Sequence, residues 1–333
     1  MKLSIRPFVL GIALCALIGI VAFGLAKIPF FLSLHLSPLI LSVLVGMALA
    51  PWYKKSGQIG IVGVLWCGKR LLRLGIVLFG FQVTLQSLLG VGVEGFLIAL
   101  LVVAGIFTLG SYLGVKLLGL DRETSMLIAC GSAVCGAAAI LALESLSKTP
   151  AHKTAIAVGV VVLFGLLSMF LYPLVYEAGF IPLSPLQEGI YTGATLHEVA
   201  NVIGASANLP KEAQEAAVIV KMIRVILLVP LLLLLSFTIL KHKEKGSNEV
   251  AIPWFALLFL GAILLGSLSF FPSWLRSLLQ SVSLFSLTLA MGALGLVSDF
   301  SKLQGIGAKA LALGAILWGV LLFGGLGLVK LLA

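Results

Sequence analysis

The chain is poor in charged residues, and acidic residues are the scarcer kind. Only 10% of its 333 residues are charged, with Asp plus Glu at 12 and Lys plus Arg at 22, whereas 61% are hydrophobic. Soluble globular chains carry about 25% charged residues. A water-soluble protein is therefore excluded. The basic residues lie between apolar runs, so the charge asymmetry of membrane proteins explains them better than nucleic acid binding does.

Cysteines and the motifs of soluble enzymes are also few. The four cysteines, Cys15, Cys67, Cys130 and Cys135, lie within or beside apolar stretches and form neither a disulfide framework nor a CxxC metal site. The chain has no Walker loop, no dinucleotide fingerprint and no Ser-His-Asp arrangement. We therefore expect no cofactor, no metal and no ATP hydrolysis, and the protein is not expected to be an enzyme.

Long apolar stretches predict an all-α polytopic membrane protein. A crossing helix needs about 20 apolar residues, and the chain offers about eleven candidates. They are residues 8–26, 36–50, 71–90, 95–118, 123–146, 154–176, 187–207, 217–240, 252–270, 276–297 and 307–331. The first is too long for a signal peptide, so we expect a retained helix.

The distribution of Lys and Arg predicts the orientation. With the N-terminus in the cytoplasm, 14 basic residues fall on the cytoplasmic side and 8 on the other. The positive-inside rule favours this orientation. An odd number of crossings then places the C-terminus outside.

The stretches after the first divide into two sets of five with matching character. We expect an extra N-terminal helix (residues 1–35), a first five-helix repeat (36–180) and a second repeat (181–333). A repeat with an odd number of crossings inserts its two copies in opposite orientations, as in many secondary transporters.

Two stretches of small residues are the first candidate site. Residues 129–139 contain Gly131, Ser132, Cys135 and Gly136, and residues 281–295 contain polar and small residues at corresponding places, Ser286, Thr288 and Gly292 among them. Close helix packing explains such stretches. The alternative is that both helices break and expose backbone N–H groups that bind an anion inside the membrane.

The segment around His197 is the second candidate site. His197 and Asn201 share one helix face, with Glu198 beside them. The segment nearly matches the zinc-protease motif HExxH, but Asn201 replaces the second histidine, so an intramembrane metalloprotease is disfavoured. Two interpretations stay open: His197 and Glu198 are a solvated pair at the membrane surface, or they form part of a polar surface that faces the interior of the helix bundle. His197 and Glu198 are also candidates for carrying a coupling proton.

Lys221 and Arg224 form the third candidate, three residues apart on one helix face. If their helix enters the membrane near Lys211, Arg224 lies about 20 Å deep. If it enters near Val218, both side chains reach the surface instead. An anion site requires positive charge, which favours the deeper placement.

Several segments resemble the YeiH-like bacterial membrane proteins, which are labelled as sulfate exporters. They are residues 71–85, 128–140, 193–205, 220–230 and 287–296. The resemblance implies a bacterial inner (plasma) membrane protein with a fold similar to the bile-acid and sodium symporter group, in which residues 123–146 and 276–297 are broken crossover helices. The chain has few acidic residues inside its spans, which puts sodium coupling in doubt.

These observations favour a secondary transporter that moves a small sulfate-like or sulfonate-like anion by alternating access. The predicted substrate site comprises Gly131, Ser132, Cys135, Gly136, His197, Asn201, Lys221, Arg224, Ser286, Thr288 and Gly292. The alternatives are a sodium-coupled importer of an organic anion and an intramembrane enzyme built on His197 and Glu198. Proton or sodium coupling and assembly as a homodimer stay open.

Overall fold

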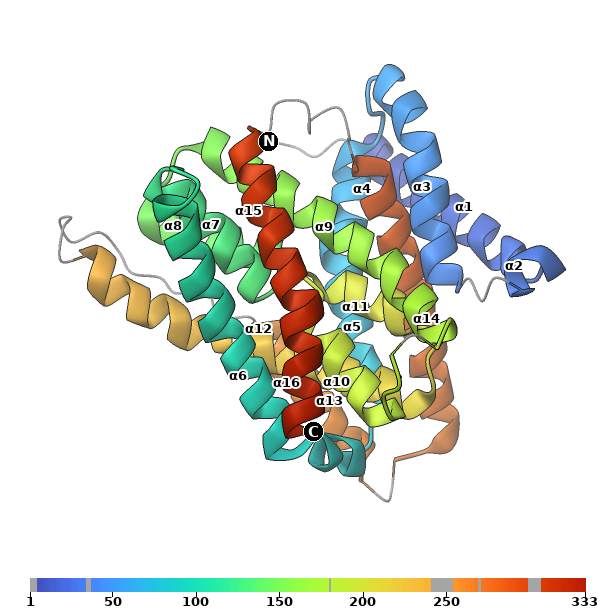
Figure 1. Cartoon of the computed structure of the whole chain (residues 1–333). Helices are drawn as coiled ribbons and strands as arrows, with labels where there is room; N and C mark the ends of the chain where they lie inside the picture. Colours follow the sequence, from blue (N-terminus) through green and yellow to red (C-terminus); the bar gives the residue numbers. More distant parts are fainter. Residues whose placement is uncertain (1–4, 34–36, 180, 241–253, 269–270, 299–306) are drawn as a thin grey trace. The chain divides into compact units, whose positions relative to one another are not determined.

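The computed structural model describes residues 5–33, 37–179, 181–240, 254–268, 271–298 and 307–333, and these residues form helices and turns with no strand (Figure 1). The helices form two compact units. Unit 1 comprises Met1–Gln86 with Trp254–Phe300, and unit 2 comprises Ser87–Pro253 with Ser301–Ala333. The predicted span 252–270 and the loop before it lie partly outside the described residues. The boundaries of the predicted repeats, 36–180 and 181–333, stay a prediction.

Unit 1 is a bundle centred on one long helix, α14. Its elements are α1 (Ile5–Leu25), α2 (Pro29–Ser33), α3 (Pro38–Lys55), α4 (Ile61–Trp66), the π-helical turn η1 (Cys67–Leu71), α5 (Leu72–Phe79), α13 (Trp254–Gly266) and α14 (Ser273–Val297). Helix α14 packs against α3, α5 and α1. The core includes Cys15, Ile18, Cys67 and Leu289, which are all buried.

Unit 2 contains the other helices. They are α6 (Leu85–Lys116, whose first two residues belong to unit 1), α7 (Arg122–Ala133), α8 (Ala137–Ser147), α9 (Ala151–Glu177), α10 (Pro185–Thr195), α11 (Val199–Ser206), α12 (Lys211–Leu240), α15 (Ala308–Gly319), the π-helical turn η3 (Val320–Gly324) and α16 (Gly325–Leu332).

Six stretches of the described residues are long and apolar enough to cross a membrane. They are Arg6–Leu25, Leu85–Lys116, His152–Glu177, Lys211–Leu235, Ser273–Val297 and Ala308–Leu332. The protein is therefore a membrane protein with several apolar helices, as expected. Eleven separate crossings are not confirmed, and two of the predicted spans have a different form.

The predicted span 123–146 is a helical hairpin that returns to the end at which it began. A straight helix over α7 and α8 would be about 39 Å long. However, the Nζ of Lys153, just after α8, lies 2.8 Å from Asp121 and 3.0 Å from Glu123, at the start of α7. Near the turn, the Sγ of Cys130 contacts the carbonyl oxygen of Ala139. The expectation that this stretch crosses the membrane is wrong, because α8 runs back along α7.

The predicted span 187–207 is a second hairpin, formed by α10 and α11. Gly189 packs against Ala213, and Gly193 packs against Ala217, so α10 and α12 lie side by side and run in the same direction. Helix α11 connects the end of α10 to the start of α12, and therefore returns along α10. The expectation that residues 187–207 cross the membrane is therefore also wrong.

The two hairpins enter unit 2 from opposite ends of α9. The start of α9 carries Lys153, which binds the start of α7. Towards the other end of α9, the ring of Tyr172 stacks on Tyr191 of α10 with 5.0 Å between centroids. Figure 1 shows α9 running from the α7–α8 hairpin towards α10. Since α9 has 27 residues, it spans about 40 Å, enough to separate the two sides of a membrane.

The second predicted break, within 276–297, is absent because α14 is continuous. Its small and polar residues serve helix packing instead. Gly295 lies against Val43 and Gly46 of α3, where a Cβ atom would meet backbone atoms, and a Cβ atom at Gly292 would meet the side chains of Ile18 and Ser42. The hydroxyl of Ser42 donates to the carbonyl oxygen of Thr288 at 2.7 Å. The small residues let the backbones of α14 and α3 approach closely, and the polar side chains hydrogen-bond within this contact. Helix α14 therefore stays unbroken.

Candidate functional site at the hairpin tips

The tip of the first hairpin is a turn that depends on glycine. Val134 leaves the helical conformation at φ −116° and ψ −89°, and Gly136 has φ 72°, a value that favours glycine. The end of α7 and the start of α8 then leave carbonyl and N–H groups without partners in their own helices. In a buried turn these groups must be satisfied by other parts of the protein.

The tip of the second hairpin comprises Leu196, His197 and Glu198, between α10 and α11. Leu196 and Glu198 have extended backbones, with ψ near 150°. The last carbonyl groups of α10 are therefore also free to accept bonds from outside the helix.

Lys221 of α12 binds both tips. Its buried Nζ donates to the carbonyl oxygen of Val134 at 2.7 Å in the first tip. It also donates to those of Leu196 at 2.6 Å and His197 at 2.7 Å in the second tip. An ammonium group has three donors, so all three are used.

Arg224, one turn later on α12, also binds both hairpins through its guanidinium group. It donates to the carbonyl oxygens of Ser132 and Ala133 at the end of α7, and to those of Gly193 and Leu196 at the end of α10, at 2.7–3.4 Å. Lys221 and Arg224 are both 0% exposed. The alternative in which they reach the surface is therefore excluded.

Glu198 carries the opposite charge at the opposite kind of helix end. Its Oε1 accepts a hydrogen bond from the backbone N–H of Ala137, the first residue of α8, at 3.1 Å. The two cations thus lie at the C-terminal ends of α7 and α10, and the carboxylate lies at the N-terminal end of α8. Each charge matches the helix dipole that it meets.

Three side chains of the second hairpin have buried polar atoms without a hydrogen-bond partner among the described residues, and one of them, Ser206, is the last residue of α11. The other two are the imidazole of His197, at both Nδ1 and Nε2, and the amide Nδ2 of Asn201. Their exposures are 1% and 4%. Gly165 of α9 packs against both, where a Cβ atom would collide with Asn201. Buried polar groups are nearly always bonded, so an orphan pair indicates a site for a ligand or water.

Most, but not all, of the predicted site residues belong to unit 2. Gly131, Ser132, Cys135 and Gly136 lie at or beside the first tip, and they share unit 2 with His197, Glu198, Asn201, Lys221 and Arg224. Ser286, Thr288 and Gly292 lie on the continuous α14 of unit 1. The hydroxyl of Thr288 donates to the carbonyl oxygen of Leu284 within that helix.

Gly165 and Glu188 are the neighbouring residues that sequence reasoning missed. Gly165 gave no signal in the sequence beyond its position in an apolar run. Glu188 did, because a carboxylate inside a predicted span is itself a functional indication. Among the described residues, no group of three His, Cys, Asp or Glu side chains is placed to hold a metal ion.

Comparison with known proteins identifies relatives along the whole chain. A family model described as conserved hypothetical protein 698 matches residues 10–314. The UPF0324 membrane protein WS2204 of Wolinella succinogenes is 98% identical over 333 residues, which cover 100% of both chains. A UPF0324 membrane protein of Helicobacter hepaticus is 44% identical over 349 residues, with 100% of both chains covered. These matches agree with the resemblance to the YeiH-like proteins.

More distant relatives cover slightly less of the chain. The UPF0324 membrane protein Cj0999c of Campylobacter jejuni is 42% identical over 310 residues, which cover 87% of this chain and 85% of that protein. No solved structure matches. Similarity to the bile-acid and sodium symporter group is not shown, and its implied crossover helices are here a hairpin and a continuous helix.

Proposed function

We propose that this chain, which belongs to the UPF0324 family of membrane proteins, is a secondary transporter that moves a small anion such as sulfate through the hairpin tips. The observation that carries the proposal is the meeting of two oppositely inserted hairpins at Lys221 and Arg224, beside the orphan side chains of His197 and Asn201. Irregular backbone at membrane depth is tolerated where it lines a cavity or is buried in protein, and transporters place their substrates there.

The charges at the tips favour an anion. Lys221 and Arg224 bring two positive charges, and Glu198 returns one negative charge. The N–H groups of both cations already bind backbone carbonyl groups, so they attract an anion by their field rather than by direct bonds. His197 and Asn201 supply the donors that would contact the anion, and the first N–H groups of α11 lie next to them in the chain.

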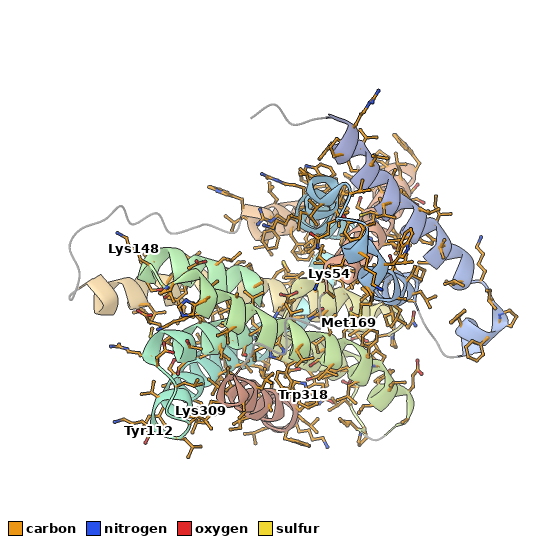
Figure 2. The ribbon with its side chains drawn as sticks, turned by 90° about the horizontal axis from the view of Figure 1, so that it is seen from above. Lys54, Tyr112, Lys148, Met169, Lys309 and Trp318 are labelled. Carbon is orange, nitrogen blue, oxygen red and sulfur yellow. The ribbon has the colours of Figure 1, made fainter. Side chains whose placement is uncertain are left out.

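The distribution of basic residues in unit 2 supports an orientation. The end at which the α7–α8 hairpin opens carries Lys116, Arg122, Lys148, Lys153 and Lys309. The other end carries Lys211 and Lys330. Figure 2 shows Lys148 and Lys309 on the same side of the view. By the positive-inside rule the first hairpin then opens to the cytoplasm and the second to the outside, in the plasma membrane of a bacterium.

Sulfate flux into liposomes tests the proposal. The purified protein should exchange radioactive sulfate faster than protein-free liposomes do. His197→Ala and Asn201→Ala should each lower this rate about tenfold or more, because a hydrogen bond to a charged group contributes about 1.5–3 kcal/mol and 1.4 kcal/mol is a factor of ten.

A polar residue of unit 1 provides the matched control. The hydroxyl of Ser283 donates to the carbonyl oxygen of Gly75 at 2.7 Å, in the α5–α14 contact, so Ser283→Ala should lower stability and leave the flux per folded protein unchanged. Wild-type flux equal to that of empty liposomes would reject sulfate as the substrate. Normal flux in both hairpin variants would reject the site.

A further inference from the structure

A carboxylate is buried in the second hairpin, away from its tip. Glu188 lies in the first turn of α10 and is 3% exposed. The hydroxyl of Thr192 lies 3.5 Å from its Oε1, and none of the ion pairs among the described side chains includes Glu188. Burial of a carboxylate without a cation is unfavourable. The positive end of α10 offsets part of this penalty, and binding of a proton or a cation would remove it.

The surroundings of Glu188 suit a proton better than a metal cation. Glu188 lines a narrow pocket with Tyr172, Tyr176 and Tyr191, whose other walls are Val175, Ile181 and Leu322. The space open to the centre of a water molecule is about 20 Å³, and one water needs about 10–15 Å³. The pocket therefore admits about one water, whereas a hard cation requires several oxygen ligands.

Two of the three phenol groups of the pocket, those of Tyr172 and Tyr191, are already engaged. The hydroxyl of Tyr172 lies 2.7 Å from the Oγ1 of Thr195, and that of Tyr191 donates to the carbonyl oxygen of Leu322 at 3.0 Å. Glu188 is thus the group in the pocket best placed to gain or lose a proton.

Besides these tyrosines, the ionisable groups at this end of unit 2 belong to α9, α12 and α16, and Glu177 of α9 is exposed. Helix α12 packs against α10 and carries Glu215, which binds Lys211 at 3.6 Å and accepts a hydrogen bond from Ser87. It also carries Glu212, which is exposed. Helix α16 contributes the exposed Lys330. Of the two cations near Glu188, Lys330 is therefore on the surface and Lys211 pairs with Glu215.

We propose that Glu188 is a proton-binding site and that it couples transport to a proton gradient. This inference rests on the proposed function. A proton from the outer solution adds to a carboxylate oxygen of Glu188 and leaves a neutral carboxyl group, with no other bond made or broken. Its release to the opposite solution completes the cycle.

The polar face of α10 connects Glu188 to the proposed anion site. Glu188, Thr192 and Thr195 are spaced by four and three residues, so they lie along one face of the helix. Thr195 is followed directly by the tip residues Leu196 and His197, about 12 Å from Glu188 along the axis. A change of charge at Glu188 therefore acts on the helix that carries the substrate site.

Infrared difference spectroscopy during a pH titration tests the proton site without reference to any substrate. The wild-type protein in lipid nanodiscs should show a protonated carboxyl band that Glu188→Gln removes and Glu212→Gln retains. The band should be the same in sodium and in potassium chloride. A band that survives Glu188→Gln, or that disappears on addition of sodium, would overturn the proposal.

Sulfate flux under a pH gradient tests the coupling. In wild type and Glu212→Gln, one pH unit should drive sulfate accumulation up to about tenfold for each coupled proton, and Glu188→Gln should exchange sulfate without accumulating it. Equal accumulation in all three proteins would overturn the coupling role. A titrating Glu188 band in a protein that moves no sulfate would instead retain the proton site and reject the sulfate transporter.

Discussion

Residues 129–139 and residues 281–295 have similar compositions but different structures. The first stretch turns back at Val134–Gly136, whereas the second stays one helix. The difference lies in what each stretch meets. Lys221 and Arg224 bind the carbonyl groups that the turn releases, whereas α14 meets the closely packed backbone of α3. A glycine-rich membrane helix therefore breaks where distant cations satisfy the break.

Arg224→Met should have the largest effect on this comparison. The change leaves at least three buried carbonyl groups of the two hairpins without their donor, and each unsatisfied group costs about 1–3 kcal/mol. We expect a loss of more than about 3 kcal/mol in the free energy of unfolding, seen as a large fall in thermal midpoint in detergent. Lys330→Met, on the exposed end of α16, should change little. Equal midpoints for the two variants would contradict the role of Arg224 in holding the tips.

Two glycine substitutions should sharpen the comparison with smaller effects. Gly136→Ala places a side chain at φ 72° against Glu198. The strained backbone alone should lower the free energy of unfolding by about 1–2 kcal/mol. Gly295→Ala forces α14 away from α3. Both should lower the thermal midpoint, and only Gly136→Ala should also lower sulfate flux per folded protein.

Gly327→Ala is the matched control, since nothing lies within 4 Å of its Cβ position. The contrast between tip and packing glycines would be broken if Gly295→Ala lowered the flux of the folded protein as strongly as Gly136→Ala.

The smallest effect is expected at the base of the first hairpin. Partial burial raises the pKa of Asp121, but hydrogen bonds from Lys153 and Thr124 outweigh it and lower the pKa from 3.8 to about 2. A lowered pKa stabilises the folded protein above pH about 4, and the contribution disappears as the pH falls through about 2. Asp121→Asn keeps a good helix cap and loses the ion pair.

We therefore expect Asp121→Asn to lower the free energy of unfolding by less than about 1 kcal/mol. The side chain of Asp121 is 46% exposed, and solvent screens such ion pairs. Unfolding midpoints at low and high salt measure this. The difference from wild type should shrink as salt rises, and a difference that grows with salt would exclude the ion pair as its cause.

The sequence predicted the helical class, the membrane and most of the tip residues, but not the hairpins. Residues 123–146 are long and apolar enough for a crossing, and hydropathy does not distinguish a helix that crosses from one that returns. A signal was present in Lys148 and Lys153, which oppose the N-terminus-inside orientation if the stretch crosses and support it if the stretch returns.

For a related reason, the sequence predicts the second break within residues 276–297, whereas the structure has it at Leu196–Glu198. Ser286, Thr288 and Gly292 match a broken helix in composition, whereas Leu196–Glu198 contains no glycine. The partners that decide between a break and a packed helix, Lys221 and Ser42, are distant in sequence from the stretches that they contact. Local composition therefore located the first break and misplaced the second.

Chemical labelling from each side of the membrane tests the hairpin arrangement most directly. Leu117 and His152 are exposed residues that flank the first hairpin, and Glu212 is exposed beyond the second; the four native cysteines are buried. Leu117→Cys and His152→Cys should react with an impermeant maleimide from one side, the cytoplasm, and Glu212→Cys from the other. Reaction of Leu117→Cys and His152→Cys from opposite sides would show that residues 123–146 cross the membrane and would contradict the account.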